Sequence, residues 1–75
     1  MGQDVLLHNR KILADNVKSL REQKKIRREE LSLALGFDNS YISKLEKGKI
    51  NITIDKLSIL ANYFNIEITD LFKKL

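Results

Sequence analysis

Four polar residues near the middle of the chain carry groups that could read another molecule. They share one short segment, at Asn39, Ser40, Ser43 and Lys44. Their amide, hydroxyl and ammonium groups can together donate and accept hydrogen bonds at the edges of DNA bases. Ile42 and Leu45 alternate with them at helical spacing. This pattern places the polar groups on the outer face of a helix and the apolar pair on its inner face.

The segment before these residues predicts a second helix that crosses the first steeply. Leu31, Ala34 and Leu35 recur at helical spacing, and Gly36 follows them. Glycine suits the left-handed residue that ends a helix, because it has no Cβ to clash. Only positions 36 and 37 separate this helix from Asp38, a favourable N-cap residue for the next one. Two short helices joined so tightly cannot lie antiparallel, so the pattern indicates a helix-turn-helix.

Ser32 supports this interpretation, because a small side chain is needed where the two helices approach closely. The apolar residues Leu31 and Leu35 then face inward. The second helix, over residues 39–47, is the candidate recognition helix. The alternative is an ordinary helical hairpin with a solvated outer face. We favour the helix-turn-helix because the small residue, the glycine and the inward apolar residues all stand where that motif needs them.

Several motifs resemble those of the phage repressor/Cro (Xre-type) DNA-binding family. They lie at residues 26–32, Gly36, residues 40–48, residues 51–61 and residues 70–72. The resemblance covers about residues 15–73, and it is greatest to the small controller proteins of restriction-modification systems. The chain departs from the family at Arg27 and Arg28, where Thr or Ser and then Gln are usual. It also has Ser32 where the family usually has Ala.

The resemblance implies an all-α fold, a compact five-helix bundle with a central helix-turn-helix like that of lambda repressor. It implies a transcriptional regulator that places its recognition helix in the major groove of an operator in double-stranded DNA. Asn39 and Ser40, at the N-terminal end of that helix, would reach bases. Lys44, one turn further on, would reach a base or a phosphate, and Ser43 would complete the base-reading set.

The resemblance also implies a set of contacts with the DNA backbone and one structural ion pair. The phosphate-contacting set is Arg28, Tyr41, Lys47, Lys49 and Asn51. Arg28 has a reason of its own, because a cation in the first turn of a helix is mildly unfavourable and a phosphate there would relieve it. Arg21 would pair with Glu46 at the end of the recognition helix.

Charge divides the chain into two parts. The formal net charge is +4, and residues 10–28 hold eight basic side chains against Asp15 and Glu22. Residues 51–75 are balanced, with three basic and three acidic side chains. A basic part beside a neutral one suggests a face for a polyanion and a second face with another role.

Apolar residues left over in the neutral part predict a homodimer. One core stripe does not use all of Ile59, Tyr63, Ile66 and Leu75, and a symmetric partner could cover them. A short domain also gains stability by association. The alternative is a monomer whose extra apolar residues are scattered over its surface.

The remaining composition excludes several classes of protein. The chain of 75 residues predicts a single domain, residues 1–75, without cysteine and without a long apolar run. We therefore expect a cytoplasmic protein with no membrane span, signal peptide, cofactor, metal or small-molecule ligand. With one histidine, His8, and scattered acids, the chain lacks the groups of an enzyme. An antitoxin-like module that binds a partner protein and regulates its own gene stays as the alternative function.

Three further helices complete the expected bundle. The first runs from about Arg10 to Lys24 or Lys25, and residues 1–9 either begin it earlier or form an apolar arm on the core. The fourth helix is capped by Thr53 and ends at Asn65. Its expected buried stripe is Ile54, Leu57, Leu60, Ala61 and Phe64. A short fifth helix spans about residues 68–74, with Leu71 and Phe72 facing inward.

Overall fold

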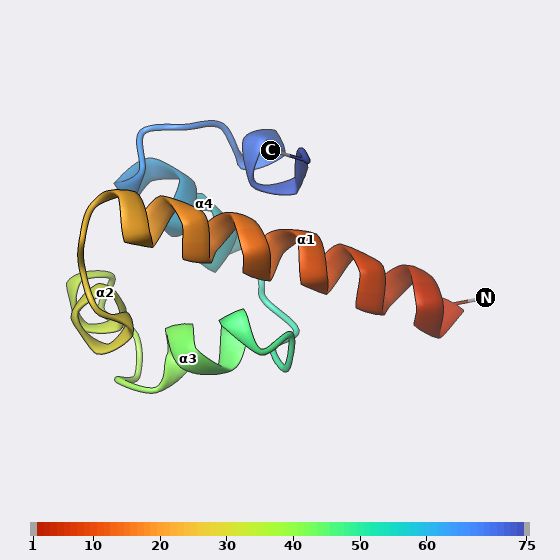
Figure 1. Ribbon diagram of the computed structural model, residues 1–75, viewed down its shortest axis with the longest axis horizontal. Helices are drawn as coiled ribbons and strands as arrows, with labels where there is room; N and C mark the ends of the chain where they lie inside the picture. Colours follow the sequence, from red (N-terminus) through yellow and green to blue (C-terminus); the bar gives the residue numbers. More distant parts are fainter. Residues whose placement is uncertain (1, 75) are drawn as a thin grey trace.

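One long helix organises the fold. The computed structural model describes residues 2–74, with side chains from residue 5 onward. Its elements are α1 (Gly2–Gln23), α2 (Arg28–Ala34), α3 (Tyr41–Glu46), α4 (Ile54–Tyr63) and the 3-10 helix η1 (Ile68–Phe72). Helix α1 crosses the molecule, with α3 packed on one side and η1 on the other (Figure 1). The all-helical class is as predicted, but the fifth helix is a 3-10 helix.

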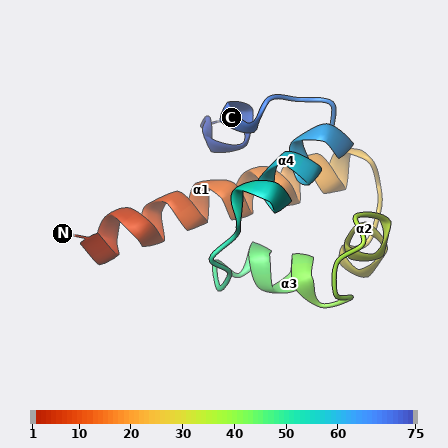
Figure 2. The ribbon, with the colours of Figure 1, turned by 180° about the vertical axis from the view of Figure 1, so that it is seen from behind.

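Helix α1 begins earlier than Arg10, so the first of the two alternatives for residues 1–9 holds. Its first turns project beyond the rest of the molecule in both ribbon views (Figures 1 and 2). The apolar side chains of residues 5–7 are exposed there, and so they form no arm on the core. Further along, Leu13, Ala14 and Val17 are buried. The helix ends before Lys25, which adopts a left-handed conformation with φ of 58°.

Helices α2 and α3 form the predicted helix-turn-helix. Leu31 and Ile42 are fully buried in the core, whereas Leu35 is half-buried. Ala34 is exposed, although it shares the helical spacing of the two leucines. Gly36 has φ of +76°, and no heavy atom lies within 4 Å of a Cβ built there. The glycine is therefore needed for its backbone conformation, not for space.

Helix α4 closes the other side of the core. The Thr53 hydroxyl accepts a hydrogen bond from the backbone N–H of Lys56 at 3.2 Å, so the predicted N-cap is confirmed. Four members of the expected stripe are buried, namely Leu57, Leu60, Ala61 and Phe64. The prediction for Ile54 was wrong, because this first residue of the helix is exposed. Asn65 ends the segment with φ of 57°, as expected of a helix terminator.

The C-terminal segment packs on α1 through one leucine and one asparagine. Leu71 is fully buried, but Phe72, expected to face inward, is exposed. The buried amide of Asn16 donates hydrogen bonds from Nδ2 to the carbonyl oxygens of Leu71 and Lys73, both at 2.7 Å. The segment is too short for a stable α-helix of several turns, so a single 3-10 turn held by Asn16 takes its place.

No helix within residues 2–74 is both long enough and apolar enough to cross a membrane. Helix α1 has the length, with 22 residues, but charged side chains recur along it. The core instead lies between its inner face and the four shorter elements.

Candidate nucleic-acid interface

The recognition helix begins two residues later than its sequence predicts. The carbonyl oxygen of Asp38 accepts the backbone N–H of Tyr41 at 2.9 Å. Its carboxylate accepts both the backbone N–H and the hydroxyl of Ser40. These bonds hold residues 38–41 in a turn, because a local side-chain acceptor competes with the helix. Asp38 is therefore not the N-cap, and Asn39 and Ser40 precede α3.

The same turn affects the charge of Asp38. The hydroxyl and backbone N–H of Ser40 hold the pKa of the Asp38 carboxyl below its ordinary value, since both bonds favour the charged form. Asp38 therefore stays ionised throughout the neutral range. The bonded turn presents Asn39 at the N-terminal end of α3.

Of the four candidate base-reading residues, Asn39 and Ser40 immediately precede α3, and Ser43 and Lys44 lie within it. Asn39 and Lys44 are exposed, whereas Ser40 and Ser43 are half-buried. On the opposite side of the same helix, Ile42 and Leu45 are buried against the core. The structure thus leaves all four polar side chains at least partly accessible at the start of α3 and along it.

A buried serine joins the two helices of the motif. The hydroxyl of Ser32, which is fully buried, accepts a hydrogen bond from the backbone N–H of Ile42 at 3.0 Å. It donates one to the carbonyl oxygen of Arg28, also at 3.0 Å. The N–H of Ile42 lies in the first turn of α3, where no carbonyl of the helix can accept it. Sequence reasoning treated Ser32 as merely small. The signal that could have predicted these hydrogen bonds was a polar hydroxyl at a position expected to be buried where two helices cross.

An ion pair ties α1 to the end of α3. Arg21 donates from Nε to Oε2 of Glu46 at 2.7 Å and from Nη2 to Oε1 at 3.2 Å. Its Nη1 donates to the carbonyl oxygen of Ile26 at 2.9 Å. The side chains of Arg21 and Glu46 are only 9% and 4% exposed. The hydrogen bond to Glu46 raises the pKa of Arg21, so the guanidinium is charged at every accessible pH.

The same carboxylate holds a second arginine, which the sequence did not predict. Arg28, the first residue of α2, donates from Nε to Oε1 of Glu46 at 3.0 Å. Its side chain is 52% exposed, in contrast with the buried Arg21. Glu46 therefore connects α1, α2 and α3 at a single point. This contact depends on the directions in which the side chains of three helices point, and these directions cannot be derived from sequence spacing.

The other candidate phosphate contacts lie at the two ends of α3. Lys47, Lys49 and Asn51 follow the helix in an exposed loop, where Gly48 adopts φ of +72°. Tyr41 begins the helix and is half-buried. Burial raises the pKa of its phenol, so the hydroxyl keeps its proton at neutral pH and can donate a hydrogen bond to an anion.

An aromatic pair and a lysine support Tyr41. The rings of Phe37 and Tyr41 lie 4.8 Å apart, centroid to centroid. The ammonium of Lys56, on α4, lies 4.6 Å from the Tyr41 ring centroid and 5.4 Å from that of Phe37. A cation over two aromatic faces is attracted by both. This cluster attaches α4 to the turn that precedes the recognition helix.

The residues expected at a subunit contact differ in exposure. Ile59 is 42% exposed on α4. Tyr63 and Ile66 are half-buried and pack partly against the core. Leu75 lies outside the described residues. Of the three described positions, Ile59 therefore offers the most accessible apolar surface.

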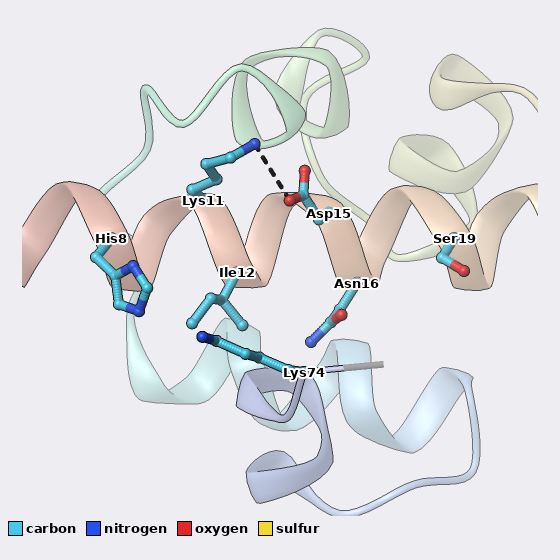
Figure 3. A pocket seen from close by; sticks show the side chains of 7 residues that line it. All are labelled: His8, Lys11, Ile12, Asp15, Asn16, Ser19 and Lys74. Carbon is cyan, nitrogen blue, oxygen red and sulfur yellow. Dashed lines mark ion pairs between the residues drawn. The ribbon is translucent and has the colours of Figure 1, made fainter.

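One hollow on the surface lies away from α3. It has a volume of about 400 Å³ and lies along α1 near the C-terminal segment. His8, Ile12, Asn16 and Lys74 point into the space between these elements, whereas Lys11 and Asp15 form an ion pair on the other side of α1 (Figure 3). His8 is exposed, and within the described part of the chain no three metal-binding side chains gather.

Comparison with known proteins places this arrangement in a family. Residues 17–71 match the helix-turn-helix family. The control protein C.SmaI of Serratia marcescens is 32% identical over 65 residues, which are 87% of this chain and 77% of that protein. Solved structures agree. The hypothetical transcription factor NHTF from Neisseria superposes with a TM-score of 0.82 at 28% identity, over 87% of this chain and 75% of that one.

A second solved structure is the restriction-modification controller protein C.AhdI from Aeromonas hydrophila. It superposes with a TM-score of 0.77 at 28% identity, over 84% of this chain and 96% of that one. The matched residues include the whole of α2, the turn and α3, and these elements carry the polar surface described above. The chain belongs to the Xre-type helix-turn-helix family of DNA-binding transcriptional regulators.

Proposed function

We propose that this protein regulates transcription by binding an inverted-repeat operator as a homodimer. In each subunit α3 enters the major groove, with Asn39, Ser40, Ser43 and Lys44 at the base edges. The observation that carries the proposal is the outward polar surface of α3 over a buried apolar face. Side chains that are exposed and able both to donate and to accept are what the major-groove code requires.

Cations and hydrogen-bond donors on either side of that surface suit the DNA backbone. Arg28 and Tyr41 stand at the start of the two helices, and Lys47, Lys49 and Asn51 follow α3. Contacts of this kind fix register on the duplex, whereas base contacts carry the sequence information. The named relatives include a control protein and a restriction-modification controller, so we assign this chain the role of a controller in such a system.

Selection of bound duplexes from a random DNA pool tests the proposal. We expect the recovered sequences to contain two inverted half-sites about 34 Å apart, or one helical turn, because a two-fold dimer presents two recognition helices. Recovery of no consensus would contradict the proposal of sequence-specific recognition.

A salt titration provides a second, independent measurement. With about four phosphate contacts per subunit, the slope of log affinity against log salt should be roughly −5 or steeper for the dimer. A slope near zero would rule out binding to the DNA backbone.

A further inference from the structure

Two arginines and one glutamate at the junction of α1, α2 and α3 leave a net positive charge in a defined place. Arg21 and Arg28 contribute two positive charges, and Glu46 contributes one negative charge. Arg21 is buried, and its Nε, Nη1 and Nη2 all donate to Glu46 or Ile26. The uncompensated charge therefore belongs to the accessible guanidinium of Arg28.

Arg28 also keeps most of its hydrogen-bond donors. Its guanidinium bonds to Glu46 through Nε, and its Nη1 and Nη2 make no hydrogen bond with the backbone of residues 2–74 or the side chains of residues 5–74. These two nitrogens form the end of a planar fork, which matches two oxygens of one phosphate group. Fixing Nε on a buried carboxylate determines the direction in which that fork points.

We propose that Glu46 is a positioning residue for the DNA backbone contact. It accepts a hydrogen bond from Nε of Arg28 and so orients Nη1 and Nη2 to bind two oxygens of one phosphate. The inference rests on the proposed function, because it assigns the geometry of one contact in the same interface. Holding the fork in place before binding reduces the side-chain ordering that binding requires.

A substitution that keeps the charge separates a positioned fork from a simple positive charge. Lysine cannot offer a planar fork, so R28K should lose affinity for the selected duplex several-fold while its salt slope stays at the wild-type value. R28A should lose about tenfold, since hydrogen bonds to charged groups are the strong ones, and its slope should flatten by about one per subunit.

Arg27 provides the matched control. It precedes Arg28 in the chain, is 87% exposed and pairs with Glu30, not with Glu46. R27K should bind like the wild type. If R28K also binds within about twofold of the wild type while R27K does so too, the proposal of a positioned fork is overturned. If the wild type itself shows no salt-dependent binding, it is instead the proposed function that fails.

A double-mutant cycle tests the part played by Glu46. If Glu46 positions Arg28, the affinity lost on R28A should be smaller in an E46Q background than in the wild type. If Glu46 only neutralises Arg28, its removal frees the charge, and the loss on R28A should be larger. An equal loss in both backgrounds, or a larger one in E46Q, overturns the proposal. Circular dichroism at the binding temperature shows whether E46Q is folded, and if it is not, the comparison of R28K with R27K decides.

Discussion

At the residue scale, Asn39 is the side chain on which sequence reading should depend most. It is exposed beside the N-terminal end of α3, and an amide can bond adenine through two hydrogen bonds. We expect Asn39→Ala to cost about 1–3 kcal/mol on the selected duplex and much less on mixed-sequence DNA. Parallel titrations on the two duplexes measure the difference. Equal losses on both would show that Asn39 does not read bases.

Ser32 illustrates a residue whose role is hidden until the helices are placed. Ser32→Ala would leave the buried N–H of Ile42 without an acceptor, and we expect a loss of about 1–3 kcal/mol in the free energy of unfolding. Urea denaturation measures it. Ser58→Ala is the control, because the Ser58 hydroxyl is exposed and donates only to a carbonyl of its own helix. Equal stability of the two variants would contradict the role of Ser32.

At the element scale, the shared carboxylate makes the two ends of the ion pair unequal. Glu46→Ala leaves the buried guanidinium of Arg21 with only the carbonyl of Ile26, so we expect a loss of about 3–5 kcal/mol. Arg21→Ala should cost less, because Arg28 still bonds to Glu46. Thermal unfolding of both variants measures which substitution destabilises the protein more.

The double variant Arg21→Met with Glu46→Met should recover much of that stability, since it buries no unpaired charge. The double variant removes the ion-pair partner of Arg28 alone, and the Arg28 side chain is exposed and solvated. Two single variants that melt like the wild type would show that the pair contributes nothing. A larger loss for Arg21→Ala would contradict the sharing of the carboxylate.

The lysine over the two aromatic rings links α4 to the turn before α3. Lys56→Met keeps the apolar stem but removes the charge, so we expect a loss of about 0.5–2 kcal/mol. Lys24→Met is the control, because the ammonium of Lys24 lies 5.5 Å from a single ring, that of Tyr63, at an exposed position. Unfolding in urea compares them. If both variants had the same stability, the lysine over two rings would contribute no more than the lysine near one ring.

Elements defined by periodicity could be predicted, but most of their side-chain contacts could not; the pair of Arg21 with Glu46, implied by the family resemblance, is the exception. Spacing and end residues located the helix-turn-helix, the Thr53 cap and the terminator at Asn65. They left open whether residues 1–9 begin α1 or form an arm on the core, because the apolar Val5, Leu6 and Leu7 fit either structure. They also missed Asn16, a polar residue within an apolar stripe, which was the visible signal of a buried hydrogen bond.

The candidate site shows the same division. Which side chains face outward on α3 follows from helical spacing alone. The turn at Asp38 and the bond from Arg28 to Glu46 depend on side-chain directions that spacing does not give. The outward position of Ser43 and Lys44 was therefore predictable, whereas the turn at Asp38 and the contact of Arg28 with Glu46 were not.

At the scale of the whole molecule, two apolar surfaces compete for the role of subunit contact. One is Ile59 with the half-buried Tyr63 and Ile66, and the other is the projecting start of α1 around Leu6, which is 54% exposed. The first lies within residues 17–71, which match the family, and the second lies outside them. A lone recognition helix reads too few base pairs to find one site in a genome, so the proposed function requires a dimer. We therefore predict that its contact lies on the surface around Ile59.

Sedimentation equilibrium at micromolar concentration tests both the dimer and its surface. We expect the wild type to sediment at about twice the 8.7 kDa of one chain. Ile59→Lys should shift it to a monomer and weaken binding to the full operator, because a charge buried in the contact would have no partner. Leu6→Lys, at a position of similar exposure, should leave the dimer intact. A monomeric wild type that stays monomeric on DNA would exclude the dimer. A monomer produced by Leu6→Lys but not by Ile59→Lys would instead place the contact on α1.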